Sequence, residues 1–241
     1  MSETNGRVAG AERIIVALDL PEREALALAD ALPRGTWLKV GMTAFYAAGP
    51  RIVAELKARG FRVFLDLKLH DIPHQVREAS AVLGELGADL LTVHGSGGAD
   101  MVAAAREGLD RAGAATKILA VTVLTSMDAA ALAQIGVGRP LPDQVRELAR
   151  GSYAAGADGV VCSPLEARDL RAALGPEALI VTPGVRPAGA NAGDQTRVAT
   201  PGAAIKNGAS HVVVGRPITQ AADPAAAFEA IAADIRRCDA N

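Results

Sequence analysis

Short apolar runs alternate with longer amphipathic stretches along almost the whole chain. The short runs have the length and the Val, Ile and Leu content of strands buried on both faces, whereas the longer stretches repeat their apolar residues with a helical period. The predicted strands are 13–18, 36–40, 62–68, 89–93, 117–124, 158–161, 178–181 and 211–214. The predicted helices are 21–32, 50–59, 74–86, 99–112, 143–155, one opened by Pro164, 200–207 and 224–236.

Eight strand–helix pairs in a chain of 241 residues match a (β/α)8 barrel, the TIM-barrel fold, in number and in length. The competing fold is a doubly wound open sheet. Such sheets usually have fewer strands at this length and often begin with a glycine-rich turn, which is missing here. No linker or shift in composition divides the chain. We therefore expect a short polar leader over residues 1–11 and a single barrel domain over residues 12–241.

The composition agrees with one globular domain, because 50% of the residues are hydrophobic and 22% are charged. The formal net charge is −2, without a basic stripe or an aromatic ladder, so nucleic acid is not an expected partner. No apolar run approaches a membrane span and the start of the chain lacks a signal-peptide core, which predicts no membrane association and a cytoplasmic location. Cys162 and Cys238 have no motif spacing and are expected to be reduced.

The stretch 64–73, FLDLKLHDIP, places an acid and a base two residues apart on an apolar strand. Side chains alternate along a strand, so Asp66 and Lys68 should point to the same face. The chain has only five lysines, and a charge pair inside an apolar strand requires good geometry, although a purely structural ion pair is the simpler alternative. Asp71 breaks the alternation and Pro73 ends the strand, so Asp71 should lie at the strand's rim.

Functional side chains of a barrel lie where its strands end. Taken singly, most candidates there have a structural explanation: Asp19 or Ser163 could cap a helix, and His94 could be a hydrogen-bonded core residue. Two acids and two lysines on three adjacent strands are nevertheless more charge than a barrel core needs, which favours a catalytic site. The residues at the predicted strand ends are Asp19, Lys39, Asp66 with Lys68, His94, Thr125 with Ser126, Ser163, Thr182-Pro183-Gly184 and Gly215-Arg216.

The loops after the seventh and eighth strands carry a second signal, a phosphate site. Pro183-Gly184-Val185-Arg186 follows one strand and Gly215-Arg216-Pro217 follows the other. Barrels commonly bind phosphate at these two loops. Glycine lets backbone N–H groups approach an anion, and arginine presents a planar fork of donors.

Together these motifs resemble the orotidine 5′-monophosphate decarboxylase family. The resemblance runs from Arg13 to about Arg236 and is carried by Asp66-x-Lys68-x-x-Asp71-Ile72-Pro73, with Asp19 and Lys39 upstream and the two arginine loops downstream. It implies a homodimer of barrels that converts orotidine 5′-monophosphate to uridine 5′-monophosphate and CO₂, the last step of de novo pyrimidine nucleotide synthesis. It also implies that the reaction uses neither a cofactor nor a metal.

The resemblance assigns roles by motif position. Lys39, Asp66, Lys68 and Asp71 would form the catalytic charge network, with Lys68 stabilising and protonating the C6 carbanion. Asp71 and Ile72 would enter the neighbouring subunit's site. The remaining substrate contacts would come from Asp19, Lys39 and Asp71 at the ribose hydroxyls, Thr125 and Ser126 at the ribose and pyrimidine, and Gln195, Gly215 and Arg216 at the phosphate, with Pro183 and Arg186 beside it.

Three other functions compete with this one. Related barrels that act on keto-sugar phosphates with magnesium resemble this chain but carry a metal-binding acid where Lys39 stands. An epimerase-like barrel would need metal-binding histidines at its strand ends, and His94 alone is insufficient. A barrel that merely binds a phosphorylated ligand would not need Lys68. The decarboxylase is therefore the function that the sequence favours.

Overall fold

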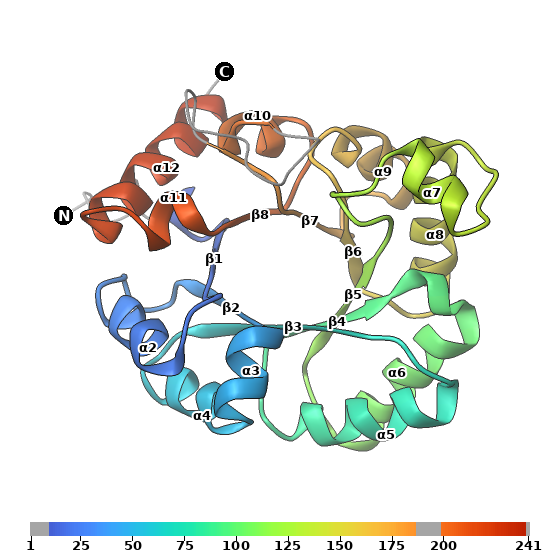
Figure 1. Ribbon diagram of the computed structural model, residues 1–241, viewed down its shortest axis with the longest axis horizontal. Helices are drawn as coiled ribbons and strands as arrows, with labels where there is room; N and C mark the ends of the chain where they lie inside the picture. Colours follow the sequence, from blue (N-terminus) through green and yellow to red (C-terminus); the bar gives the residue numbers. More distant parts are fainter. Residues whose placement is uncertain (1–9, 187–198, 240–241) are drawn as a thin grey trace.

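Eight parallel strands close into a barrel in sequence order, with β8 pairing back to β1 (Figure 1). The computed structural model describes residues 10–186 and 199–239. Its strands are β1 (Ile14–Ala17), β2 (Trp37–Gly41), β3 (Arg62–Leu69), β4 (Leu90–His94), β5 (Lys117–Val121), β6 (Gly159–Val161), β7 (Leu179–Thr182) and β8 (His211–Val214). The predicted (β/α)8 barrel is confirmed.

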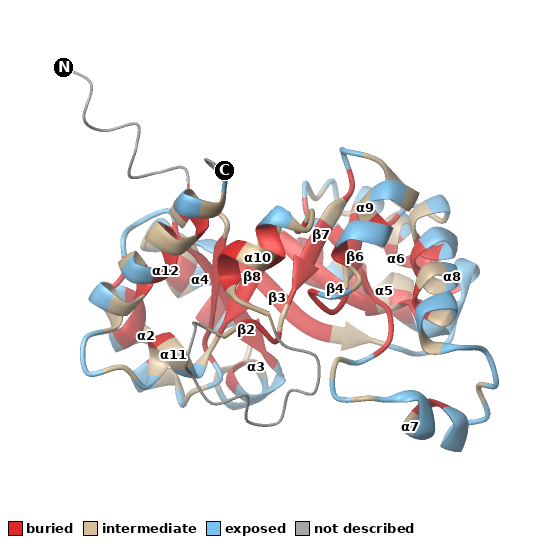
Figure 2. Cartoon of the chain, turned by 90° about the horizontal axis from the view of Figure 1, so that it is seen from above, coloured by how far each residue is buried: buried red, intermediate tan, exposed pale blue. Residues whose placement is uncertain are grey.

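Helices form a ring around the strands, with buried residues facing the barrel and exposed residues facing outwards (Figures 1 and 2). Among the described residues, three short helices in the loops after strands were not predicted, because four to seven residues are too few to display a helical repeat. These three are α3 (Met42–Ala48), α7 (Ala129–Gln134) and α11 (Arg216–Thr219). The others are α2 (Glu22–Asp30), α4 (Arg51–Ala58), α5 (Pro73–Gly84), α6 (Ala99–Arg111), α8 (Leu141–Ala154), α9 (Ala167–Leu174), α10 (Pro201–Lys206) and α12 (Pro224–Asp239), with a 3-10 turn at Gly95–Gly97.

The start of α9 corrects the prediction that Pro164 opens this helix and that Ser163 caps it. The Ser163 hydroxyl accepts a hydrogen bond from Leu165 N at 3.2 Å, and the Ser163 N–H donates to Glu166 Oε2 at 2.9 Å. These local bonds form a separate turn over residues 163–166, so the helix begins only at Ala167. A serine followed by proline favours such a turn as well as a cap.

Two apolar layers hold the barrel together. One lies between the strands and the surrounding helices, and the other fills the barrel itself. The inner layer consists of Ile15, Ala17, Trp37, Phe64, Leu90, Leu119, Val181 and Val213. Phe64 belongs to this layer, so Asp66, two residues further along β3, stands directly above an apolar floor.

His211 lies at the opposite end of the barrel and gives the fold a pH dependence. Its ring packs edge-on against Trp37, with 5.5 Å between the ring centres. Burial, together with the cations Arg13, Arg62 and Lys117, lowers the pKa of His211 to about 4. Folding therefore favours the neutral imidazole.

We expect this histidine to cost stability in acid. An unfolded histidine takes up its proton near pH 6.5, so the contribution of His211 is fully present above that pH and is lost as the pH falls towards 4, by on the order of 3 kcal/mol. The free energy of unfolding of wild type and of His211→Gln, measured from pH 8 to pH 4, should therefore converge in acid. Parallel curves would contradict this assignment.

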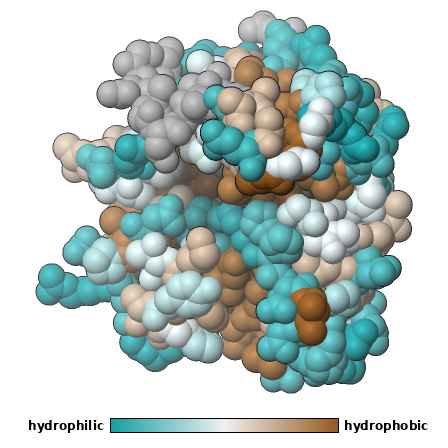
Figure 3. Space-filling model, turned by 45° about the vertical axis from the view of Figure 1, so that its right-hand side comes forward, coloured by the Kyte–Doolittle hydropathy of each residue, from teal (hydrophilic) through white to brown (hydrophobic). Residues whose placement is uncertain are grey.

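Hydrophilic residues dominate the outer face shown in Figure 3, and hydrophobic residues show mainly in the furrows between them. None of the helices in the described ranges has the length and apolar character needed to cross a membrane. The predicted leader is described only at Gly10, which is buried, and at Ala11, which packs against the outer apolar layer.

Candidate active site

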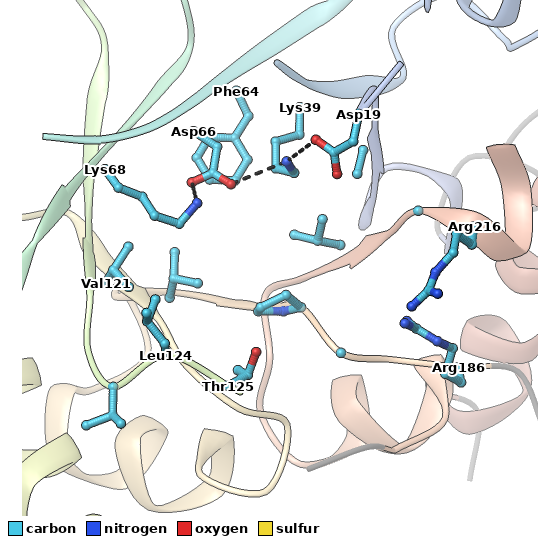
Figure 4. Close-up of a pocket in the computed structure, with 17 residues that line it drawn as sticks. Asp19, Lys39, Phe64, Asp66, Lys68, Val121, Leu124, Thr125, Arg186 and Arg216 are labelled. Carbon is cyan, nitrogen blue, oxygen red and sulfur yellow. Dashed lines mark hydrogen bonds and ion pairs between the residues drawn. The ribbon is translucent and has the colours of Figure 1, made fainter. Parts of the chain in front are cut away.

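A cavity of about 310 Å³ opens where the strands end (Figure 4). Nine predicted site residues line it: Asp19, Lys39, Asp66, Lys68, Thr125, Pro183, Arg186, Gly215 and Arg216. Its apolar wall was not predicted from the sequence and is formed by Ala17, Phe64, Val121, Val123, Leu124, Val161 and Val213. Most of these are inward-facing strand residues, so the barrel prediction could have identified them.

Four charged residues form a chain along one side of the cavity (Figure 4). Lys39 Nζ lies 3.0 Å from Asp19 Oδ1 and 3.3 Å from Asp66 Oδ2. Lys68 Nζ lies 2.8 Å from Asp66 Oδ1. The two carboxylate oxygens of Asp66 are thus each paired with a different ammonium group.

The central pair of this network is buried, since only 8% of Lys39 and 9% of Asp66 is exposed. Burial alone would raise the pKa of Asp66. The charges of Lys39 and Lys68 and the hydrogen bonds from Lys68 and Thr92 outweigh it, so the pKa of Asp66 is lowered. Asp66 is therefore ionised at neutral pH and presents a fixed negative charge between two lysines.

The register of the first three strands brings these side chains together. Lys39 pairs with Ala17 and with Phe64, and Gly41 pairs with Asp66, so Asp66 lies on the strand next to Lys39, two residues further along in register. Gly41 also leaves the room that the network needs. A Cβ at this position would lie 2.8 Å from Asp19 Oδ1 and 3.0 Å from Lys39 Nζ.

Asp66 and Lys68 meet as predicted, but not through the regular alternation of a strand. Leu65 pairs with Leu91 and Leu69 pairs with Val93, so three residues of β3 lie opposite the single residue between those partners on β4. Lys68 has a φ of 54°, the only positive φ of a non-glycine residue in the described parts of the chain. The strand is therefore bulged at the site, and the bulge aims Lys68 into the cavity.

Two arginines face each other across the other side of the cavity (Figure 4). Arg216 begins α11, and Arg186 follows β7 and the turn at Gly184, whose φ of 78° favours glycine. The Arg186 backbone N–H donates to Ala199 O at 3.0 Å, which holds the backbone at Arg186. Two facing guanidinium groups provide a suitable place for a doubly charged anion. Gln195, the third predicted phosphate ligand, lies outside the described residues.

Three predicted site residues do not line this cavity: Asp71, Ile72 and Ser126. All three are exposed. Asp71 Oδ1 accepts a hydrogen bond from the backbone N–H of Ile72 at 2.6 Å, and within the described residues Asp71 makes no ion pair with Lys68. His94 also stays outside the cavity lining. It packs against His70, with 5.2 Å between the ring centres, and burial, His70 and Lys68 lower its pKa.

The fold and the site together define a (β/α)8 barrel enzyme with a lysine–aspartate network facing a pair of arginines. The sequence profile described as "Orotidine 5'-phosphate decarboxylase / HUMPS family" matches residues 12–231. The chain therefore belongs to this family.

Named relatives cover nearly the whole chain. A protein of Halorhodospira halophila named orotidine 5'-phosphate decarboxylase is 53% identical, over 95% of this chain and 98% of its own length. One of the same name from Cutibacterium acnes is 52% identical, over 92% of this chain and 95% of its own. The crystal structure of orotidine 5'-phosphate decarboxylase from Lactobacillus acidophilus is 42% identical and superposes with a TM-score of 0.83, covering 92% of this chain and 98% of that one.

Proposed function

We propose that this protein decarboxylates orotidine 5′-monophosphate to uridine 5′-monophosphate and CO₂, the last step of de novo pyrimidine nucleotide synthesis. The observation that carries the proposal is the Lys68 ammonium, which lies in the cavity and is held 2.8 Å from a buried, ionised aspartate. The names of the relatives support the choice of substrate. The direct test is release of CO₂ from orotidine 5′-monophosphate by the purified protein.

The chemistry suits a fixed cation. Loss of CO₂ from C6 of the pyrimidine leaves an electron pair in the plane of the ring, where the ring's π system cannot delocalise it. Many decarboxylases use a cofactor as the electron sink. Here the Lys68 ammonium stabilises the carbanion as it forms, as preorganised charge does in other sites, and then transfers a proton to C6. The C6–CO₂ bond is replaced by a C6–H bond, so the products are uridine 5′-monophosphate and CO₂. Lys68 then regains its proton from water.

The two ends of the cavity orient the substrate. Lys39 lies between Asp19 and Asp66, and in this proposal Asp19 and Lys39 bind ribose hydroxyls, while the Arg186–Arg216 pair binds the 5′-phosphate on the other side. Thr125 lines the cavity and in this proposal contacts the nucleoside between them, with the apolar wall around the base. Such positioning holds C6 against Lys68 and so lowers the entropic part of the barrier.

A keto-sugar phosphate reaction with a divalent metal, as in the related barrels that resemble this chain, is the competing function. A metal ion would need free carboxylate oxygens at this site. Both oxygens of Asp66 are paired with ammonium groups, and one of these belongs to Lys39, which stands where the metal-using relatives carry an acid. This charge pattern favours decarboxylation without a metal or another cofactor.

Arg216→Ala should lower kcat/KM for orotidine 5′-monophosphate by at least about 10²-fold, the scale for loss of a charge-assisted contact, and change the rate with the unphosphorylated nucleoside orotidine little. The phosphate is remote from C6, so its binding energy serves to order the site. The matched control is Arg111→Ala, which removes an exposed arginine ion-paired with Glu78 outside the cavity. Equal losses on both substrates would show that Arg216 does not hold the phosphate.

A homodimer that shares its active sites completes the proposal. Asp71 and Ile72 directly follow β3, the strand that carries Asp66 and Lys68, and both are exposed, Ile72 with 65% of its surface accessible. A second subunit would cover Ile72 and receive the Asp71 carboxylate at its own Lys68. A cytoplasmic location remains a prediction from the sequence.

A further inference from the structure

Thr92 lies on β4 directly opposite the bulge that carries Lys68. Between the pairs Leu65–Leu91 and Leu69–Val93, β3 has three residues, whereas β4 has only this threonine. Regular pairing of backbone groups is therefore interrupted at this level of the sheet. Thr92 is fully buried, with 0% of its surface exposed.

The hydroxyl of Thr92 makes two hydrogen bonds, both to the lysine–aspartate network. It accepts one from the Lys68 backbone N–H at 2.9 Å and donates one to Asp66 Oδ1 at 3.1 Å. It thus satisfies the N–H group that the bulge removes from the regular ladder. It also fixes the carboxylate oxygen that Lys68 Nζ contacts at 2.8 Å.

The backbone of Lys68 needs this support. A φ of 54° is sparsely populated for a residue with a side chain, and such conformations persist only where the surroundings hold them. Of the described contacts, the Thr92 hydroxyl is the one that binds both the backbone of Lys68 and the side chain of Asp66. Only a side chain that donates and accepts through the same atom, as a hydroxyl does, can make both the bond to the Lys68 N–H and the bond to Asp66.

We propose that Thr92 is a positioning residue, whose hydroxyl sets the bulged conformation of β3 and thereby aims the Lys68 ammonium at the reacting carbon. The consequence for turnover rests on the decarboxylase function proposed above. Thr92 does not line the cavity, so it acts through Lys68 and Asp66 rather than on the substrate.

The test compares Thr92→Val, which keeps the shape but removes the hydroxyl, with Thr92→Ser, which keeps the hydroxyl. Thr92→Val should lower kcat by about 10²-fold, the effect of misplacing a catalytic group by roughly 1 Å. KM should change by less than about threefold, because Lys68 acts in the transition state rather than in substrate binding. Thr92→Ser should retain kcat to within about fivefold, because the bonding atom is retained.

The matched control is Thr116→Val. Thr116 is also a buried threonine, but its hydroxyl donates to Ala88 O at 2.7 Å, far from the cavity lining. Its loss should lower the melting temperature without lowering kcat. If Thr92→Val does not fold, Thr92→Ser and Thr92→Ala give the same comparison, because they differ in one hydroxyl.

Two results would overturn the inference. One is a folded Thr92→Val variant with kcat within about threefold of wild type, and the other is an equal loss of kcat in Thr92→Val and Thr92→Ser. If wild type itself does not turn over orotidine 5′-monophosphate, the proposed function fails and crystal structures decide the positioning claim. Thr92→Val should then lose the positive φ of Lys68 and its contact with Asp66, and their retention would refute the claim.

Discussion

Replacing Lys68 with alanine should abolish measurable decarboxylation while leaving the barrel folded. The loss should be at least about 3 kcal/mol of barrier lowering, which is the scale for one oriented donor in a preorganised site. Lys68 is expected to supply both the charge that stabilises the carbanion and the proton that replaces CO₂, so the effect should exceed that minimum. Single-turnover measurements with saturating substrate would separate this loss from any change in binding.

The control for Lys68→Ala is Lys57→Ala. Lys57 also forms an ion pair of 2.8 Å with an aspartate, Asp89, but it lies outside the cavity. Both variants lose one lysine and one ion pair, so they should lose comparable stability. Only Lys68→Ala should lose turnover, and near-normal turnover by folded Lys68→Ala would remove Lys68 from the mechanism.

The second large effect concerns Asp71. Asp71→Ala should also be nearly inactive, although Asp71 is exposed and lies outside the cavity of its own barrel. We expect this because we propose that its carboxylate serves the neighbouring subunit's Lys68, where loss of a charge-assisted contact would cost about 2–3 kcal/mol. Action of Asp71 in the neighbouring site requires a dimer, so the assembly of the protein should be measured alongside its turnover.

Mixing two inactive variants tests whether Asp71 acts in trans. Lys68→Ala and Asp71→Ala are dissociated, combined in equal amounts and reassociated. Half of the random dimers are then mixed, and each mixed dimer has one doubly damaged site and one intact site, so about a quarter of wild-type activity should return. If Asp71 serves its own barrel, every site carries a lesion and no activity returns.

A second mixture tests whether recovered activity depends on residues that belong to different sites, and subunit exchange is confirmed separately. Lys68→Ala combined with Asp66→Ala damages two residues of the same cavity, so each site in a mixed dimer keeps one lesion. This mixture should restore nothing under the same conditions. Recovery there would show that the restored activity of the first mixture does not report a shared site.

Much of this site could be predicted because closed parallel barrels align the ends of their strands. Once Asp19, Lys39 and Asp66 are placed at strand ends, the register of β1, β2 and β3 brings them together. Arg186 and Arg216 come together in the same way, because they follow β7 and β8, which are neighbouring strands. These predictions depended on topology alone and not on local backbone detail.

The bulge at Lys68 could not be predicted in the same way. The regular alternation of side chains along a strand predicted that Asp66 and Lys68 point to the same face, and they do. The backbone that brings them together is nevertheless irregular, because the residues between Leu65 and Leu69 do not follow the two-residue period of a strand. In the sequence, Thr92 is a polar residue inside the apolar run LLTVH, and this polarity is the one feature that could have indicated a special role. Its role depends on pairing between strands, which a single strand's pattern does not contain.

The most direct test of the account is the turnover of orotidine 5′-monophosphate by the purified wild-type protein after exhaustive dialysis against a chelator. We predict equal amounts of uridine 5′-monophosphate and CO₂, at a rate that added magnesium does not raise. No turnover of this substrate, together with magnesium-dependent turnover of a keto-sugar phosphate, would contradict the central claim.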